Sequence, residues 1–516
     1  MDECAIFQNI SNFFATKSLM PAHFNYTTLF SYLSTIPTGL GAIVLYLQDT
    51  IPSLKDVAYL YHFRSILPIL PARFVSVFLG VSTLWILFKI GERFFSKKTG
   101  LIAAALLGFS NLHIHYSGYA LPEVTMTFFA TCSILFSLYS LETRSMKNYI
   151  IAGIFAGLTA STKYNGALIF IPIIMVHLFH LYDEKNIYSP RAWFDKRIIF
   201  SVLSFACAFL AGSPGWFLSP RSYLDALLFE QAHMDTGHMG NFGMLYVQHI
   251  ILFWRYEKII AVLFGLGLLY GIFRLDRKKS LLVALILPSF LYIGSWTNKS
   301  LHYLIFLYPA LTLLSAAFLS SIFSKLGKFQ SNTGALFLMI AIFTWPICSS
   351  FSYAYNQLLE DNRWIAYRWI QSNIPARSTI IVDWAYLPIL FSKKKKNDKF
   401  KNSPQEFYQT YLENMRTYIL IPLKYNPMWI SQIQADYFIT SSICFDRFFK
   451  TPPPAPGNPK FDDYNKRKKT YAALFTKRKE LGWESPIRFY EGKGPEILIY
   501  KKRVSGTNSL NILEKE

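Results

Sequence analysis

Ionisable residues that border apolar segments are the first candidates for chemistry in this 516-residue sequence. Such residues are costly to keep beside a membrane, so a group of them on one face indicates a function. A carboxylate can act as general base on an acceptor hydroxyl, and lysine or histidine can bind phosphate. This set therefore suits transfer from a phosphate-linked lipid donor. The candidates are Asp2, Glu3, Glu123, Lys163, His233, Asp235, His238, Lys299, His302 and Tyr303.

Each of these residues also has a simpler structural explanation. Adjacent acids at a chain start, such as Asp2 and Glu3, are usually just solvated. Glu123 follows Pro122 and can cap the helix that begins there, because the helix dipole stabilises an acid near its N-terminus. Lys163 sits in a short loop between two apolar segments, from which its long side chain can extend to lipid headgroups. The residues alone leave both explanations open.

Support for a metal centre is weak. His233, Asp235 and His238 lack the HExxH spacing that places two ligands on one face of a helix. The five cysteines are far apart and form no CxxC pair, which argues against a disulfide framework or a zinc site. We therefore predict no thiol chemistry and leave the cofactor unknown, with a divalent metal as an open option.

The composition indicates that lipid surrounds much of the chain. Hydrophobic residues make up 52% of it and charged residues only 16%, whereas soluble domains usually carry about a quarter charged residues. The net charge of +21 comes from short Lys and Arg clusters between apolar segments. Because cytoplasmic loops of membrane proteins carry such clusters, the charge predicts orientation rather than nucleic acid as a partner.

Ten apolar segments are candidates to cross a bilayer, which takes about 20 residues. We predict that a further apolar segment, 27–48, is re-entrant or lies in the interface, because Pro37, Gly39 and Gly41 interrupt it. The ten predicted spans are 70–90, 98–114, 123–141, 149–163, 165–182, 198–217, 258–274, 280–296, 303–323 and 333–352.

The charges in the connectors predict the side on which each one lies. Basic connectors are expected in the cytoplasm, and the connectors between them on the exoplasmic side, together with everything after residue 353. This assignment places all the candidate residues on the exoplasmic side. The basic connectors are 91–98, 142–147, 183–197, 274–280 and 324–329.

From residue 353 the pattern changes to that of a small soluble α/β domain. WIAYRWIQSNIP reads as an amphipathic helix that ends before a proline. STIIVDW, ADYFITSS and GPEILIYKK read as strands, whereas 393–402 and 451–459 read as loops. The predicted organisation is a first exoplasmic loop over 1–69, a transmembrane domain over 70–352 and an exoplasmic soluble domain over 353–516.

Several segments resemble the family 39 glycosyltransferases of the GT-C fold. MDECAIFQNISNFFATKSLMPAHFNYTTLFSYL resembles the first exoplasmic loop of that family, in which an acidic pair precedes an amphipathic helix. GERFFSKKTGLIAAALLGFSNLHIHYSGYALPEV resembles its basic cytoplasmic turn and the loop that follows. ARFVSVFLG, GIFAGLTASTKYNGALIFIP, KSLHYLIFLYPAL and GPEILIYKK are also similar to recurrent features of the family. The order and predicted sides of these motifs carry the resemblance more than any single one.

The resemblance implies a polytopic α-helical membrane protein of the GT-C type with a C-terminal soluble α/β domain. The family includes protein O-mannosyltransferases and the aminoarabinose transferase that modifies lipid A, both of which use polyprenyl-phosphate sugars. The implied function is transfer of a sugar from such a donor to an acceptor protein, lipid or glycan at the exoplasmic face of the cell membrane.

The resemblance also assigns roles to residues. Asp2 is the expected general base, with Glu3 as its neighbour. Glu123 is expected to orient the acceptor or to help bind a metal, and Lys163 to neutralise the donor phosphate. The remaining substrate-binding candidates are His238, Lys299 and Tyr303.

Three departures from the family pattern and two alternative functions accompany this hypothesis. Gly118 stands where the family has an arginine, and Thr27 where it has a proline. Family members begin with a transmembrane helix before the acidic pair, whereas this sequence starts at that pair, which leaves a truncated or a wrongly assigned start as open alternatives. The alternatives are a transporter or flippase of a lipid-linked substrate, and a non-catalytic scaffold. Transporters tend to carry inverted repeats, and the sequence has no evident internal repeat, which favours the enzyme.

Overall fold

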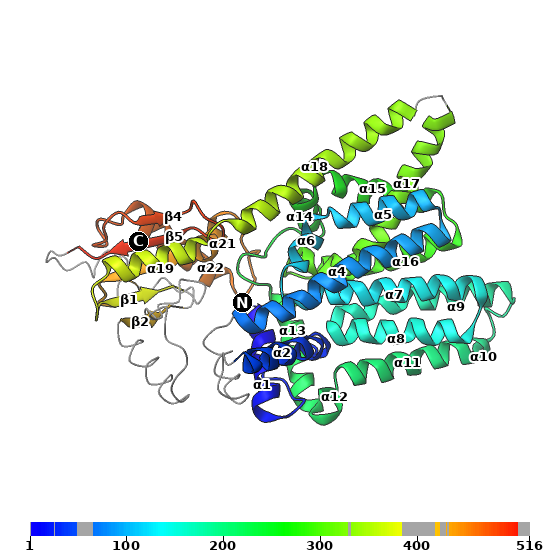
Figure 1. Cartoon of the computed structure of the whole chain (residues 1–516), viewed down its shortest axis with the longest axis horizontal. Helices are drawn as coiled ribbons and strands as arrows, with labels where there is room; N and C mark the ends of the chain where they lie inside the picture. The colour runs from blue at the N-terminus through cyan, green and yellow to red at the C-terminus, as the bar shows by residue number, and fades with distance from the viewer. Residues whose placement is uncertain are drawn as a thin grey trace. The chain divides into compact units, whose positions relative to one another are not determined.

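The chain divides into two compact units in a computed structural model (Figure 1). The membrane unit comprises Met1–Ala232, Leu245–Trp296 and Ser300–Phe351, and the sheet unit comprises His233–Met244, Thr297–Lys299 and Ser352–Glu516. Two short segments of the helical part of the sequence therefore belong to the sheet unit. The structure describes residues 2–24, 26–48, 66–328, 332–383, 418–423, 430 and 433–503.

The membrane unit is built from helices. Their bounds are α1 (Asp2–Thr16), α2 (Leu29–Leu47), α4 (Ile66–Phe94), α5 (Lys97–Gly108), α6 (Asn111–Ser117), α7 (Pro122–Thr143), α8 (Met146–Thr162), η2 (Tyr164–Phe170), α9 (Ile171–Asp183), α10 (Pro190–Trp193), α11 (Lys196–Gly212), α12 (Gly215–Leu218), α13 (Pro220–Thr236), α14 (Val247–Glu257), α15 (Ile259–Phe273), α16 (Arg277–Ser295), η3 (Leu301–Leu307), α17 (Tyr308–Lys328) and α18 (Asn332–Leu358). The last residues of α13 and α18 count with the sheet unit.

A helix occupies each of the ten ranges predicted to cross the membrane. Within the described residues, six helices are long and apolar enough to do so alone: Leu29–Leu47, Ile69–Phe94, Pro122–Thr143, Tyr164–Asp183, Arg277–Ser295 and Leu301–Lys325. The chain is therefore a multi-pass membrane protein.

Two predicted segments differ from the structure. Helix α5 ends at Gly108, and the chain turns at Ser110 into the short helix α6, so the predicted span 98–114 is two helices. Helix α2 continues through Pro37 without a break over 19 residues. The interruption that we expected there is wrong, because the flanking apolar residues keep the helix intact. Whether α2 lies in the interface stays a prediction.

Polar residues at the ends of basic connectors start several of the helices. Ser96 accepts a hydrogen bond from the backbone N–H of Thr99, and Asp195 and Asp276 do the same for the first turns of α11 and α16. These side chains satisfy N–H groups that have no partner inside the helix. The boundaries of α5, α11 and α16 are therefore encoded locally.

Close packing of small residues joins α8 to α11, and the two helices run side by side with α7 (Figure 1). A Cβ atom at Gly153 would lie 2.3 Å from the carbonyl oxygen of Ser201, and one at Gly157 would lie 2.3 Å from that of Phe205. Glycine at these positions lets the two backbones touch, as is common between helices in lipid. This packing fixes the position of the C-terminal end of α8, which carries Lys163.

The sheet unit contains a five-stranded mixed sheet of order β2-β1-β3-β5-β4. Strand β1 pairs in parallel with β2 and β3, and β5 pairs antiparallel with β3 and β4. The elements are α19 (Asn362–Asn373), β1 (Thr379–Val382), β2 (Ile419–Pro422), β3 (Tyr437–Ser441), α21 (Ser442–Phe449), α22 (Phe461–Thr476), β4 (Ile487–Phe489) and β5 (Ile497–Lys501).

The predicted helix and the three predicted strands of this unit form as α19, β1, β3 and β5, which confirms the α/β assignment. Residues 451–459 form a loop without helix or strand. The other predicted loop, 393–402, lies outside the described residues. Apolar side chains cover both faces of the sheet: Ile380 and Ile439 pack with α19, and Phe438 packs with α21 and α22.

Candidate functional site

Glu123 and Lys163 form a buried ion pair in the membrane unit. Glu123 lies in the first turn of α7, which starts at Pro122, and Lys163 caps the C-terminus of α8 in an extended conformation. The Lys163 Nζ lies 2.7 Å from Oε1 of Glu123, and the two side chains are only 12% and 5% exposed. Charges are costly to bury unless they are paired. The structure thus brings together two of the predicted site residues from separate helices.

Aromatic rings surround the ammonium group of Lys163. The Lys163 Nζ lies 4.9 Å from the centroid of the Tyr303 ring and 5.9 Å from that of Tyr26. The carbonyl oxygen of Tyr303 accepts a hydrogen bond from Asn165 Nδ2 at 2.8 Å. Ring faces attract a cation in a desolvated site. Tyr303 therefore belongs to the same group as Glu123 and Lys163. We call this group the Glu123 cluster, and its members are Glu123, Lys163, Tyr303, Tyr26 and Asn165.

Two buried polar atoms of the Glu123 cluster lack a hydrogen-bond partner among the described residues. Within the described residues, Oε2 of Glu123 and Oδ1 of Asn165 are buried and accept no hydrogen bond. An unpaired polar atom in a buried place normally costs free energy, so such atoms point to a ligand or water that completes them. Both atoms are acceptors, and they suit a hydroxyl donor better than a phosphate oxygen.

Glu3 is held by three hydrogen bonds in the membrane unit. Arg73 of α4 donates to Glu3 through Nε at 2.8 Å and through Nη2 at 2.7 Å. The backbone N–H of Ala120 donates to Glu3 Oε1 at 2.7 Å. The paired geometry of guanidinium and carboxylate is strong and directional. Glu3 therefore connects α1 to α4 and to the loop before α7.

Asp2, the other acid of the predicted pair, is the first residue of helix α1. Its side chain lies outside the described residues. Ile6 and Ile10 of α1 pack against Phe30, Ala72 and Ala120. This apolar contact and the Glu3 hydrogen bonds hold the beginning of α1, and with it the backbone of Asp2, against the membrane unit.

His238 lies in a positively charged part of the sheet unit. The rings of His233 and His238 are 5.3 Å apart, and Lys460 Nζ donates a hydrogen bond to the carbonyl oxygen of Gly237. Gly240 packs closely against Arg447, since a Cβ atom added at Gly240 would lie 2.8 Å from Arg447 Cβ. Burial, together with the charges of Arg447, His233 and Lys460, lowers the pKa of His238 to about 4. We call His233, His238, Arg447 and Lys460 the basic cluster.

Lys299 lies in the same unit and is also buried. Its backbone N–H donates to the carbonyl oxygen of Asn241 at 2.6 Å, and only 4% of the residue is exposed. Burial lowers the pKa of the Lys299 ammonium group. The nearby backbone N–H of Thr297 donates to the carbonyl oxygen of Met234 at 3.0 Å, so residues 297–299 and 233–244 form one connected part of the sheet unit.

The remaining candidates have structural partners or lie at the surface. His302 of the membrane unit packs on Tyr303, with ring centroids 4.1 Å apart, and its Nδ1 lies 2.6 Å from Ser300 Oγ. Asp235 is exposed and lies in the same segment as His233 and His238. Over the part of the chain that the structure describes, no three His, Cys, Asp or Glu side chains are placed to hold a metal ion.

Sequence reasoning missed Arg73, Tyr26 and Asn165 in the membrane unit and Arg447 and Lys460 in the sheet unit. Asn165 carried a usable signal, because it stands two residues from Lys163 in a short polar loop. Arg447 and Lys460 carried none. They are ordinary surface residue types in a soluble domain, and only the fold places them beside residues 237–240.

Comparisons with known proteins bear on the family and the fold. Residues 63–227, which include Glu123 and Lys163, match the model of the dolichyl-phosphate-mannose-protein mannosyltransferase family. Comparison with curated proteins finds no match. Among solved structures, the chain is similar to the oligosaccharyltransferase AglB of Archaeoglobus fulgidus, with 12% identity, a TM-score of 0.50, and coverage of 98% of this chain and 70% of that one.

A second solved structure matches more weakly in shape. It is ArnT of Cupriavidus metallidurans bound to undecaprenyl phosphate, with 11% identity, a TM-score of 0.48, and coverage of 97% of this chain and 93% of that one. The likeness to AglB shows a shared fold that extends over nearly the whole chain.

Proposed function

We propose that this chain, a multi-pass membrane glycosyltransferase of the GT-C fold, transfers a sugar from a polyprenyl-phosphate donor to an acceptor at the exoplasmic face. The observation that carries this proposal is the buried ion pair of Glu123 and Lys163, which both lie inside the residues that match the mannosyltransferase family. The AglB structure to which the chain is similar is a complex with an inhibitory peptide and a dolichol-phosphate, and this lipid phosphate supports a polyprenyl-phosphate donor.

We assign Lys163 to the donor phosphate. Its ammonium group is placed at a helix end, between aromatic rings, with Glu123 as its only ion-pair partner among the described residues. An ammonium group is a compact point charge that can turn toward a second anion without leaving the first. When the sugar C1–oxygen bond breaks, negative charge grows on the leaving phosphate, and Lys163 stabilises that charge.

We assign Asp2 as the general base and Glu123 as the residue that orients the acceptor. The acceptor hydroxyl gives its proton to the Asp2 carboxylate as its oxygen bonds to C1, and the polyprenyl phosphate leaves with the electron pair of the broken bond. Oε2 of Glu123 is buried and accepts no hydrogen bond within the described residues, so it can accept one from a hydroxyl. The same property makes Glu123 the next candidate for the base.

Glu3 has a supporting role in this proposal. Its three hydrogen bonds within the described residues go to Arg73 and to the backbone of Ala120. A carboxylate that is held in this way is poorly suited to exchange protons with an acceptor. Glu3 instead positions α1, and thereby the neighbouring residue Asp2.

We assign the basic cluster and Lys299 to anionic groups of the substrates. His238 and Lys299 were predicted to bind substrate, and Arg447 and Lys460 add positive charge around the same loop. Positively charged groups and neutral imidazoles both donate hydrogen bonds to phosphate. Side chains of this chain take all the roles assigned above, and we assign no cofactor.

Donor binding and transfer test the proposal in purified protein. The wild-type chain should bind undecaprenyl phosphate and should release it from a sugar-loaded form of the same lipid when an acceptor peptide or lipid is supplied. Lys163→Met should weaken undecaprenyl phosphate binding by about tenfold or more, since one charged contact is lost. Lys89→Met is the matched control, because Lys89 pairs with Glu92 at an exposed position.

The two parts of the proposal fail separately. Unchanged lipid binding by the Lys163 variant would remove Lys163 from the donor site and leave the enzyme function standing. If the wild-type chain neither binds the lipid phosphate nor turns over any sugar-loaded polyprenyl phosphate, the glycosyltransferase function with this donor is wrong.

A further inference from the structure

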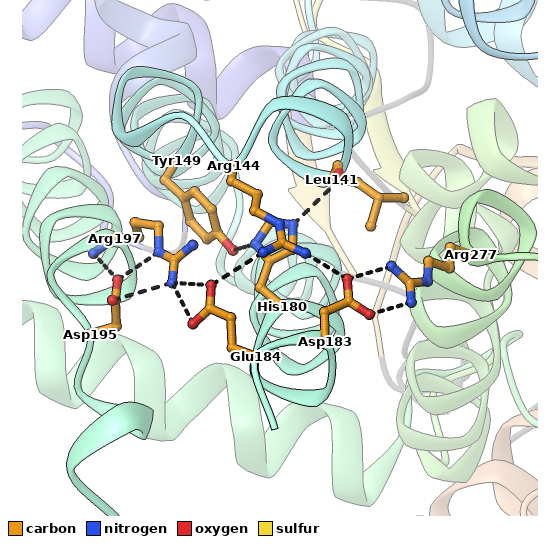
Figure 2. Close-up of polar contacts among 9 residues, drawn as sticks. All are labelled: Leu141, Arg144, Tyr149, His180, Asp183, Glu184, Asp195, Arg197 and Arg277. Atoms are coloured by element: carbon orange, nitrogen blue, oxygen red, sulfur yellow. Dashed lines mark hydrogen bonds and ion pairs between the residues drawn. The ribbon is translucent and has the colours of Figure 1, made fainter. Parts of the chain in front are cut away.

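A network of ion pairs joins the ends of four helices in the membrane unit (Figure 2). Arg277, at the start of α16, donates to Asp183 through Nη1 at 2.7 Å and Nη2 at 2.5 Å. Arg144, between α7 and α8, lies 2.8 Å from Asp183 and 3.5 Å from Glu184. Arg197, in the first turn of α11, reaches Glu184 at 3.1 Å. The basic connectors that contribute these residues are thus bound to one another.

Every acidic side chain of the connector 183–197, between α9 and α11, forms an ion pair. Residues 183–197 contain three acids, and the third, Asp195, is paired with Arg197 at 2.8 Å. Beside this layer, Tyr149 Oη lies 2.9 Å from His180 Nδ1, and His180 Nε2 faces the Leu141 carbonyl oxygen at 3.4 Å (Figure 2). The acids are therefore directed toward the protein and neutralised by arginines of the helices.

Arg197 is the exception among the cations of this connector, because the other three have no such partners among the described residues. Lys185, Arg191 and Lys196 are exposed, and within the described residues none of them takes part in an ion pair. A connector with nearly balanced charge by composition therefore presents three positive charges to its surroundings. This asymmetry follows from the tertiary pairing and cannot be read from a net charge.

Large aromatic side chains lie exposed among these cations. Tyr188 is 95% exposed and Phe194 is 75% exposed, and Tyr182 and Trp193 are also exposed. Trp193 is held by a hydrogen bond from Nε1 to the Ile187 carbonyl oxygen at 2.9 Å. Exposed aromatic rings next to lysine and arginine are typical of segments that lie at the headgroup level of a bilayer.

The position of the connector in the chain supports the same environment. It begins at Asp183, where the candidate span Tyr164–Asp183 ends, and it leads into α11. A segment that directly follows a membrane span starts at the level of the lipid headgroups. Its exposed charges meet the bilayer surface before they meet bulk water.

We propose that residues 185–196 form a binding surface for the headgroups of anionic phospholipids. Lys185, Arg191 and Lys196 contact headgroup phosphates, while Tyr188, Trp193 and Phe194 insert between the upper parts of the acyl chains. The occupant is the bilayer itself, because positive charge and aromatic surface occur together at the end of a span. This inference does not depend on the proposed glycosyltransferase function.

The decisive comparison uses charge-matched variants of the full-length protein in nanodiscs. Binding of phosphatidylglycerol is measured by exchange of a spin-labelled phosphatidylglycerol into discs of phosphatidylcholine. The triple variant Lys185→Gln, Arg191→Gln and Lys196→Gln should lower the affinity for the labelled lipid by about tenfold or more, since each cation near a charged surface contributes. The control triple variant Lys466→Gln, Lys468→Gln and Lys469→Gln removes the same charge from α22 and should bind as the wild type does.

Two further measurements separate a lipid surface from other occupants. The variant Tyr188→Ser with Phe194→Ser keeps the three charges, and it should also weaken phosphatidylglycerol binding if the rings enter the bilayer. Free glycerol phosphate should not displace the labelled lipid at concentrations that saturate a simple phosphate site. Wild-type affinity in the connector triple variant, equal losses in the control, or displacement by glycerol phosphate would each overturn the proposal, and the first would direct the search to a protein partner.

Discussion

Lys163 Nζ and Glu123 Oε1 lie 2.7 Å apart although the two residues are 40 positions apart in the sequence. They meet because α7 begins and α8 ends at the same side of the membrane unit. A pair that is buried to this degree links the stability of two helices to the presence of both charges. It therefore offers a way to separate structural from functional roles.

Removing one member of the pair should destabilise the membrane unit. Glu123→Gln or Lys163→Met alone leaves a buried charge without its partner and should lower the free energy of unfolding by about 3–5 kcal/mol. The double variant should recover much of that loss because no buried charge remains. A double-mutant cycle from thermal unfolding in detergent measures this coupling. Additive losses would show that the pair is not coupled.

The same double variant distinguishes folding from catalysis. If the Glu123 cluster serves the reaction, the recovered stability should not be accompanied by recovered transfer activity. Recovery of both would mean that the two residues act only as a structural pair.

Asp2→Asn should lower the turnover number by at least about a hundredfold, which is the lower end of general-base contributions. Undecaprenyl phosphate binding should persist, because the carboxylate acts on the acceptor. The variant is measured both in this 516-residue chain and in a form with a transmembrane helix placed before Asp2, which is the order that the family resemblance implies. An undiminished rate with Asn at position 2 would transfer the role to Glu123.

Glu3 and Arg73 should matter for stability. Glu3→Gln weakens three hydrogen bonds that involve charged groups, so unfolding should cost about 1.5–3 kcal/mol less. Arg73→Lys should have a similar effect, because an ammonium group cannot reproduce the two parallel hydrogen bonds. Glu92→Gln, at an exposed pair, should change stability by less than about 1 kcal/mol.

The sheet unit should lose stability as the pH falls from about 6.5 toward 4. The unfolded chain has an ordinary histidine pKa near 6.5, whereas His238 in the folded unit has a pKa of about 4. Between these values the unfolded state binds more protons than the folded state. The free energy of unfolding therefore decreases as the pH is lowered. Amide hydrogen exchange in β3 and β5, corrected for the intrinsic rate, follows this change.

His238→Gln should remove that part of the pH dependence. The comparison is needed because burial raises the pKa of Asp383 in the same unit, and that shift works in the opposite direction. Equal pH profiles for the variant and the wild type would mean that His238 does not titrate in this way.

Reporter fusions test the predicted orientation. Reporters placed after Lys98, Lys147 or Lys279 should score as cytoplasmic, and reporters after Gly240 or at the C-terminus as exoplasmic. A cytoplasmic C-terminus would reverse the assignment of sides and remove the exoplasmic site from the proposal.

The helices and strands of this protein were largely predictable from the order of its residues. A bilayer requires long uninterrupted apolar segments, and a strand or a helix start depends on residues that are neighbours in the chain. The ten helical ranges, the strands β1, β3 and β5 and the helix α19 follow from such local patterns. The continuity of helix α2 does not, because the helix-breaking tendency of Pro37 and the two glycines is a local preference that the rest of the helix overrides.

Which charges meet, in contrast, depends on the packing of the folded chain. Glu123 and Glu3 were both candidate site acids in the sequence, but the fold gives Glu123 one buried ion pair and Glu3 three hydrogen bonds. The fold likewise places Arg447 near His238. It also pairs Asp183 with Arg277, whereas Lys185 stays exposed. Composition counts charges, whereas an ion pair depends on distances of a few ångströms between residues far apart in the chain, and these exist only once the helices and the sheet have packed.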